Sequence, residues 1–185
     1  MALQSSGQIS LLNVATEFGG SAPHSLSEYY GAAAGIPSSG AISLSNFYGK
    51  SSSFAFTLSS NQENWNLRSA ALASGWDGTA QLVANISSGV YVWSDDTATA
   101  GLIVSGSFPG GLIVNNSGFI MGRGGNGAIY TTGNAGGPGV TVSLTSGSAT
   151  FNNQPSGYIG GGGGGGGAAN VYYGGGGGAG GGYAG

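Results

Sequence analysis

Short runs in which apolar and polar residues alternate predict several β-strands in the middle of the chain. The first run covers residues 54–58, and three more follow at residues 81–86, 90–93 and 102–104. Ser-Ser-Gly and Asp-Asp-Thr sequences, both typical of turns, lie between them. We therefore expect a small β-rich domain over residues 51–109.

One segment of this domain follows the period of a helix instead. Leu67, Ala71 and Leu72 would lie on one face of a helix at about residues 64–74, and Gly75 is a common residue after a helix end. The sequence thus predicts a domain that is mainly β with one short helix, and this domain should hold the largest conventional core.

An imperfect repeat occupies the N-terminal part of the chain. Residues 5–13 recur as residues 38–46, and residues 25–31 align with residues 43–49 along their whole length. Each copy places a serine before a short apolar run, which predicts a small helical turn. Such turns are too short to be stable alone, so their apolar side chains need another surface, for which a neighbouring subunit is a candidate.

We therefore interpret residues 1–50 as an attachment module. In the second copy, Ser25 and Glu28 have the spacing of a capping box, in which two side chains satisfy free backbone N–H groups. The residues expected to contact another subunit or another protein are the large apolar side chains of the three copies: Leu11, Phe18, Leu26, Tyr29, Tyr30, Leu44, Phe47 and Tyr48.

Glycine dominates the chain after residue 110. Its clusters lie at residues 122–127, 133–139, 160–167 and 174–182, with short apolar segments between them. A flexible linker is the ordinary interpretation of such runs. Here, however, the clusters alternate with tyrosine-bearing and apolar segments that need a surface to pack on.

Side-by-side packing offers these runs an ordered conformation. Extended glycine segments with three residues per turn can hydrogen-bond laterally through their backbones, as in polyglycine II. Ordering a glycine costs about 0.5–1 kcal/mol more than ordering an alanine, and one lateral hydrogen bond contributes about 0.5–1.5 kcal/mol. One neighbour would barely offset that cost, so we expect a polyglycine-II-like bundle in which each segment has several neighbours.

Composition and charge narrow the possible partners. The 185 residues include 42 glycines, no cysteine, and only three basic and six acidic side chains. Three basic residues are too few to neutralise a nucleic-acid backbone, and no run of about 20 apolar residues would span a membrane. The start of the chain lacks the features of a signal peptide. We expect no nucleic-acid partner, no membrane insertion and synthesis in the cytoplasm.

The titratable residues form no evident catalytic or metal-binding constellation. His24 is the single histidine, and it precedes the predicted capping serine. Asp95 and Asp96 fit a turn better than a calcium site, because no further carboxylate follows at ligand spacing. Glu63 and Asp77 would be an acid–base pair only if the fold brought them together. We therefore expect no enzyme and no cofactor.

Several of these motifs resemble phage tail proteins. Residues 5–11 and 42–50 are similar to the start of many tail proteins of cyanobacterial and marine phages, and residues 64–71 and 75–77 resemble their following domain. Residues 114–127 resemble glycine-rich tail-fibre proteins and adhesins, some of which pack polyglycine helices in a tip with receptor-binding loops. The resemblance implies a virion structural protein of a tail fibre or tail tip.

The resemblance also implies different functions for the two ends of the chain. Residues 1–50 would dock onto other tail proteins, and residues 110–185 would form a distal region that contributes to host attachment. A homo-oligomer, with a trimer favoured, would supply the neighbours that a glycine bundle needs. Two alternatives stay open. One is an architectural tail or baseplate subunit without receptor contact. The other is a non-viral ice-binding or cell-wall protein, for which flat repeated Thr or Ser faces would be expected.

Receptor contacts would come from the loops between the glycine segments. A tyrosine presents an apolar ring with a polar tip, which suits a host surface protein or polysaccharide. The candidates by position are Tyr130, Thr131, Gln154, Tyr172 and Tyr173. The same tyrosines would equally serve to cap the bundle or to pack between subunits.

Overall fold

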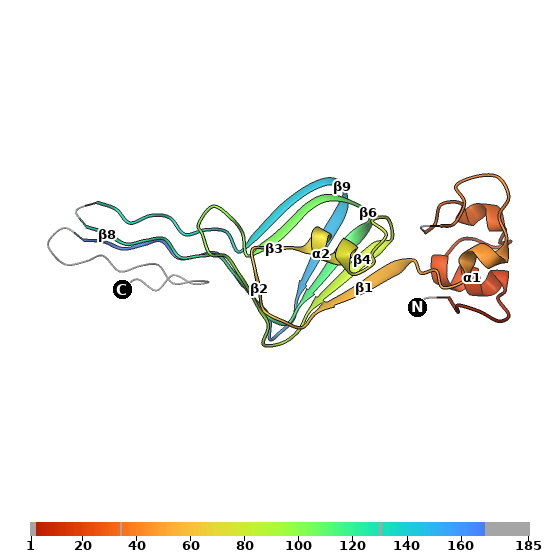
Figure 1. Cartoon of the computed structure of the whole chain (residues 1–185), viewed down its shortest axis with the longest axis horizontal. Helices are drawn as coiled ribbons and strands as arrows, with labels where there is room; N and C mark the ends of the chain where they lie inside the picture. Colours follow the sequence, from red (N-terminus) through yellow and green to blue (C-terminus); the bar gives the residue numbers. More distant parts are fainter. Residues whose placement is uncertain (1–2, 34, 130, 169–185) are drawn as a thin grey trace.

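The computed structural model describes residues 3–33, 35–129 and 131–168. Figure 1 shows three parts in a row along the long axis: a helical module, a wedge of β-strands, and a thin extension of glycine-rich segments. The predicted class is therefore confirmed at the level of a mainly β chain with short helices.

The N-terminal module contains one helical turn for each copy of the repeat. These turns are helix α1 (Leu11–Phe18) and the 3-10 helices η1 (Leu26–Tyr29) and η2 (Leu44–Phe47). They pack on one another and contribute to a shared buried core, with Val14 and Ala15 from α1, Tyr29 from η1 and Phe47 from η2. The rings of Tyr29 and Phe47 meet edge to face with centroids 6.0 Å apart. Their burial needs no second subunit.

Two copies of the repeat form a capping box. The Asn13 backbone donates to Ser10 Oγ at 3.2 Å, and the Ser10 backbone donates to Asn13 Oδ1 at 2.9 Å. Ser43 and Asn46 repeat this reciprocal arrangement before η2. A serine with an asparagine three residues later therefore fixes the start of these two turns.

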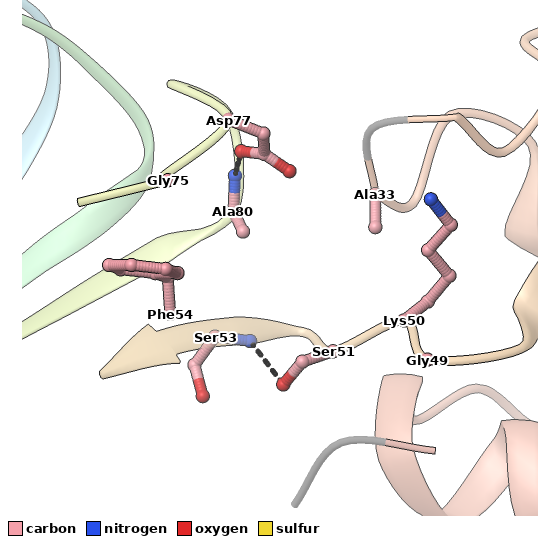
Figure 2. A pocket seen from close by; sticks show the side chains of 9 residues that line it. All are labelled: Ala33, Gly49, Lys50, Ser51, Ser53, Phe54, Gly75, Asp77 and Ala80. Atoms are coloured by element: carbon pink, nitrogen blue, oxygen red, sulfur yellow. Dashed lines mark hydrogen bonds between the residues drawn. The ribbon is translucent and has the colours of Figure 1, made fainter. Parts of the chain in front are cut away.

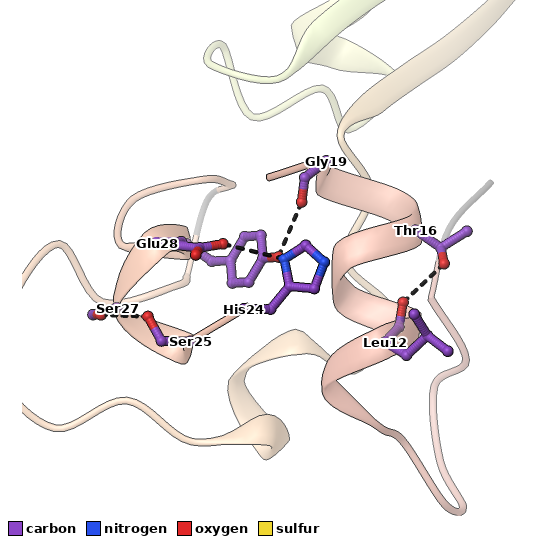
Figure 3. A network of polar contacts seen from close by, with 8 residues as sticks. Leu12, Thr16, Gly19, His24, Ser25, Ser27 and Glu28 are labelled. Atoms are coloured by element: carbon purple, nitrogen blue, oxygen red, sulfur yellow. Dashed lines mark hydrogen bonds and ion pairs between the residues drawn. The ribbon is translucent and has the colours of Figure 1, made fainter. Parts of the chain in front are cut away.

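The capping box predicted for Ser25 and Glu28 is wrong. Ser25 makes no capping hydrogen bond, and the Glu28 carboxylate lies 3.4 Å from His24 Nδ1 instead. Figure 3 shows His24 directed toward Glu28 beside the end of α1. Glutamate is longer than asparagine, so its carboxylate reaches the ring four residues earlier and bypasses its own cap. The Tyr29 hydroxyl meanwhile donates to the Gly19 carbonyl at 2.9 Å.

The strands stack into a parallel β-solenoid, since every strand pair that the structure describes is parallel. One column of stacked strands consists of β1 (Ser53–Leu58), β4 (Gln81–Ile86) and the second halves of β6 (Leu102–Asn116) and β9 (Val140–Asn153). The next column consists of β2 (Gln62–Glu63), β5 (Tyr91–Trp93), β7 (Phe119–Met121) and β10 (Tyr158–Gly160). The first halves of β6 and β9 form a third column, which β3 (Trp65–Asn66) begins.

The alternating pattern of these strands builds the core between the columns. In β4, Leu82, Ala84 and Ile86 are buried, and the residues between them are half-buried. Stacking places Leu82 beside Leu112 and Ala84 beside Val114 in the next rung. Apolar residues therefore repeat at the same positions in successive rungs, which is the stabilising feature of solenoids.

Helix α2 (Leu67–Ala73) lies between β3 and β4 and packs on β6. The helix predicted at residues 64–74 is therefore confirmed, but it starts later because Trp65 and Asn66 pair with β6 as strand β3. The Asn66 side chain caps the helix by accepting from the Ser69 backbone at 3.0 Å. Gly75 follows with a φ of 99°, which suits glycine after a helix end.

The β-solenoid does not end where the composition changes. Strand β6 runs from residue 102 to residue 116 and so crosses the boundary predicted between residues 109 and 110. The division of residues 51–185 into two domains stays a prediction, although one continuous strand joins them.

Candidate functional site

Three glycine-rich segments leave the β-solenoid together and form the thin extension in Figure 1. We call residues 122–128 segment A, residues 133–139 segment B and residues 160–167 segment C. Segments A and C follow the parallel strands β7 and β10, and segment B returns toward β9. At the far end, β8 (Ala128–Ile129) pairs in parallel with β11 (Gly167–Ala168).

Segment A donates backbone hydrogen bonds to segment C at every third residue. Gly122 donates to Gly160 at 2.9 Å, and Gly125 donates to Gly163 at 2.8 Å. Ala128 continues the series with a bond of 3.0 Å to the Gly166 carbonyl. A β-ladder would instead use alternate residues, because the period of a strand is two.

The other two pairs of segments repeat this spacing. Segment B donates to segment A from Asn134 to Asn126 at 2.9 Å and from Gly137 to Arg123 at 2.7 Å. Segment C donates to segment B from Gly162 and Gly165, and both bonds measure 2.8 Å. Each segment therefore donates to one neighbour and accepts from the other, so that the three form a closed ring of donors and acceptors.

The close approach of the backbones explains why these segments are glycine. A Cβ added at Gly125 would lie well under 3.0 Å from the Asn134 carbonyl group, and one at Gly162 would strike the Arg123 carbonyl group. The atoms in the way belong to the backbone and are themselves hydrogen-bonded. By contrast, a Cβ at Gly164 would have no neighbour nearer than 3.8 Å. Only some glycines are therefore sterically required.

The register of the segments is inherited from the β-solenoid. Strands β7 and β10 pair with Met121 opposite Gly160, and the bond from Gly122 to Gly160 follows directly. Glycine runs have no side chains that could select a register by themselves. The β-solenoid therefore aligns segments A and C where they begin.

The loop between β5 and β6 lies against the base of the segments. The Arg123 guanidinium donates to the Asp95 carbonyl, and a Cβ at Gly137 would lie 2.8 Å from Thr97 Cα. Hydrogen bonds from the Thr99 and Ala98 backbones and the Thr99 hydroxyl lower the pKa of Asp96. The turn predicted at Asp95 and Asp96 is present and braces the extension.

The two remaining carboxylates of the sequence analysis lie in different elements, and Asp77 has a structural role. Asp77 Oδ1 accepts from the Thr79 backbone at 2.7 Å and from the Ala80 backbone at 2.9 Å, which closes the turn before β4. Glu63 lies in strand β2. Among the residues that the structure describes, no group of three or more His, Cys, Asp or Glu side chains could hold a metal ion. In the same part of the chain, no helix has the length and apolar character of a membrane span.

The candidate receptor residues do not lie together. Thr131 follows β8 at the far end of segment A, whereas Gln154 lies in the turn between β9 and β10 on the β-solenoid. The Gln154 backbone donates to the Asn116 carbonyl at 2.8 Å. At about 3.1 Å per residue, the glycine segments separate the two positions by about 25 Å. Tyr130, Tyr172 and Tyr173 lie outside the described residues.

The attachment candidates divide by exposure. Tyr29 and Phe47 are buried in the core of the N-terminal module, and the other six candidates are half-buried around it: Leu11, Phe18, Leu26, Tyr30, Leu44 and Tyr48. Leu12, which the sequence analysis did not select, is 70% exposed. The repeat contained a signal for it, because Leu12 occupies the position of two exposed serines, Ser27 and Ser45.

A short linker joins the module to the β-solenoid. Glu17 Oε1 accepts from the Ser51 hydroxyl and the Ser52 backbone, both at 2.9 Å. Burial acts to raise the pKa of Glu17, but hydrogen bonds, among them those from Ser51 and Ser52, lower it overall. The linker is thus held to helix α1 by a carboxylate.

A cavity of about 250 Å³ lies beside this linker. Figure 2 shows Phe54 and Asp77 on one side of it, with Ala33 and Lys50 from the module on the opposite side. Lys50 and Asp77 both take part in other interactions. The cavity therefore marks the junction of module and β-solenoid and shows no group awaiting a ligand.

The structure thus combines a stack of parallel rungs with a narrow extension of hydrogen-bonded glycine-rich segments. The comparison with protein families shows the class of protein to which the chain belongs. The family of the phage tail fibre adhesin Gp38 matches residues 53–185, and this chain belongs to it. No curated protein and no solved structure matches.

Family membership defines the biological setting. The protein has a structural role in host attachment in the tail fibre of a phage, and its place is the virion tail, where other tail proteins and the host surface are its partners. The match begins at the first residue of β1. The N-terminal repeat module therefore lies outside the part that the family shares.

Proposed function

We propose that this protein is a non-enzymatic tip subunit in which segments A, B and C form a polyglycine-II-like spacer. The spacer holds Thr131 and Thr132, which lie beyond strand β8, away from the β-solenoid so that they can contact the host surface. The observation that carries this proposal is the closed ring of donors and acceptors, with its three-residue spacing.

The energetic expectation for ordered glycine supports this proposal. Each of the three segments has two neighbours and both donates and accepts. One neighbour offsets the conformational entropy of glycine only in part, whereas two neighbours on different sides offset more of it. A spacer of this kind is stiff without a core, because the backbone itself makes the contacts.

The N-terminal module is proposed to dock the subunit onto other tail proteins. Tyr29 and Phe47 are occupied by the module's own core, so the docking contacts fall to the exposed and half-buried residues around it. Leu12 is the most exposed large apolar side chain among the described residues, and a second protein would bury it. A trimer, favoured from the sequence, stays a prediction.

Host binding by the loop at the far end of segments A and C is tested with two pairs of variants. Thr131→Arg should weaken adsorption of the purified protein to host cells, while Ser88→Arg, in a turn of the β-solenoid, should not. Gly125→Ala should also weaken adsorption by disturbing the spacer, and Gly164→Ala should not. If all four variants adsorb like the wild type, the tip is not the contact surface.

The architectural alternative gives a different result in the same experiment. A purely architectural subunit would lose virion assembly with Gly125→Ala and would show no effect of Thr131→Arg on adsorption. The ice-binding alternative finds little support, because the outward positions form no flat Thr or Ser face. One row across the four rungs holds Ala55, Val83, Ile113 and Thr150, and another holds Thr57 followed by three asparagines. A flat Thr face would repeat one residue type there.

A further inference from the structure

One end of the β-solenoid is open in the residues that the structure describes. The last rung contains β9, which pairs with β6 on one side and with no described strand on the other. Natural edge strands usually carry proline, lysine or other charged residues that prevent pairing with another chain. Strand β9 has 14 residues, and none of them is proline or charged. Its free edge therefore lacks protection by proline or charge, and only the irregular pairing at its bend interrupts it.

The core positions of β9 are apolar and lack a covering layer. Val104 in β6 is fully buried, whereas its register partner in β9, Val142, is 49% exposed. Val114 in β6 is likewise fully buried, and its partner Phe151 is only partly buried. A further strand along β9 would give this rung the cover that the inner rungs already have.

Four central core positions of β9 are also symmetric about its bend. Val142 and Leu144 hold core positions before the bend, and Ala149 and Phe151 hold them after it. Gly147, with a φ of 81°, lies between the two halves. The register shifts between β6 and β9 change the inward positions from even to odd numbers at this bend. The apolar pattern of these four positions therefore reads the same in both directions, whereas the two outer core positions differ, because Val140 holds one and Asn153 the other.

We propose that the free edge of β9 pairs antiparallel with β9 of a second copy of this chain, about a two-fold axis between residues 146 and 147. In this register Val142 lies opposite the partner's Phe151, and Leu144 lies opposite the partner's Ala149. Apolar side chains then cover apolar side chains at the centre of the core side, Val140 lies opposite the partner's Asn153 at its ends, and Ser, Thr and Asn meet on the outer side.

Charge and symmetry select a second copy as the occupant. Two identical uncharged strands meet without like-charge repulsion, and a two-fold interface requires a surface that is complementary to itself. The four central core positions of β9 meet that requirement. The pairing gives dimers, whereas a trimer has no two-fold axis, so particle size separates the two states.

Cross-linking tests the register directly. The natural chain has no cysteine, so the double variant Ser143→Cys, Thr150→Cys contains the only two thiols. These positions face each other across the proposed interface, and within one bent strand they lie at most about 23 Å apart. Mild oxidation should give a disulfide-linked dimer. In the control variant Ser143→Cys, Asn152→Cys, the second thiol lies two residues further along the strand and no longer faces the first. This variant should cross-link at least tenfold more slowly.

Sedimentation velocity tests the apolar contact. Wild type and Ser143→Lys should form dimers, while Val142→Lys should raise the dimer dissociation constant at least tenfold, because its lysine would be buried against the partner. Because Val142 is half exposed in the single copy, the circular dichroism spectrum of the Val142→Lys variant should equal that of the wild type. A wild-type chain that is monomeric at every concentration, with β9 amides protected from exchange, would overturn the proposal and assign the edge to residues 169–185. Equal cross-linking of both double variants would also overturn it.

Discussion

In the β-solenoid each rung is held both by backbone hydrogen bonds and by stacked apolar side chains, whereas in segments A, B and C the backbone alone makes the contacts. The rungs keep Leu82, Leu112 and Val114 buried between the columns. The segments leave no room for even a Cβ at Gly125 or Gly162. Lateral bonding thus stabilises two neighbouring regions that make opposite use of side chains, and substitutions should affect them in opposite ways.

Removing a large side chain should damage the β-solenoid most. Phe108 is fully buried and stacks on Trp76 with ring centroids 5.4 Å apart. Phe108→Ala should lower the free energy of unfolding by about 3–5 kcal/mol, because it leaves a cavity in the core. Chemical denaturation measures this, with the half-exposed Tyr91→Ala as the control. Equal losses in both variants would contradict a core-based solenoid.

Adding a side chain should damage the glycine segments. Gly125→Ala introduces a methyl group against a fixed backbone carbonyl and should cost about 3 kcal/mol, at the upper end of the usual range for overpacking. Gly164→Ala has space for its methyl group and should change stability by less than about 0.5 kcal/mol. The loss with Gly125→Ala should appear as faster amide exchange confined to segments A, B and C. Two indistinguishable variants would mean that the backbones do not touch.

Asparagines at the ends of strands β6 and β9 hydrogen-bond to one another and to the backbone through their side chains. Asn116 is fully buried, donates to Asn153 Oδ1 at 2.8 Å and accepts from the Gly118 backbone at 3.1 Å. Asn116→Ala should cost about 1–2 kcal/mol because it leaves the Gly118 amide without its partner. The more exposed Asn115→Ala should cost less than about 1 kcal/mol. Thermal unfolding compares the two variants, and the opposite order would be inconsistent with this assignment.

The smallest effect should come from the linker and should depend on pH. The pKa of Glu17 is lower in the folded chain than in the unfolded chain, so its contribution to stability is present above the unfolded pKa and is lost as the pH falls through the folded pKa. Wild type should therefore unfold at a higher temperature than Glu17→Gln near pH 7, and the difference should vanish at lower pH. A difference that grows on acidification would contradict the role given to Glu17.

The sequence predicted the individual strands and helices better than it predicted how they pair and pack with one another. The runs at residues 54–58 and 81–86 are strands, and the helix ends before Gly75 as expected. Parallel pairing of β1 with β4 depends on contacts between residues far apart in the chain, which alternation alone does not specify. Tyr29 and Phe47 were expected to need another subunit for the same reason, since nothing local shows that three short turns share one core.

In the glycine segments, too, the local conformation was predictable from the sequence and the alignment of one segment with another was not. Their extended conformation and their lateral bonding could be expected from composition and from the entropy of glycine. Their register could not, because it is set where β7 and β10 place Met121 opposite Gly160. The separation of Thr131 from Gln154 follows from this arrangement. Thr131 comes after segment A and Gln154 comes before segment C, so the two residues lie at opposite ends of the glycine segments.

Residue-resolved amide exchange, measured by NMR, tests the lateral bonding of the segments most directly. Protection should recur at every third residue, at the donors Gly122, Gly125, Gly162 and Gly165, while Gly164 between the last two exchanges fast. Protection at alternate residues would indicate an ordinary β-ladder. Uniformly fast exchange across residues 122–128 and 160–167 would contradict the spacer altogether.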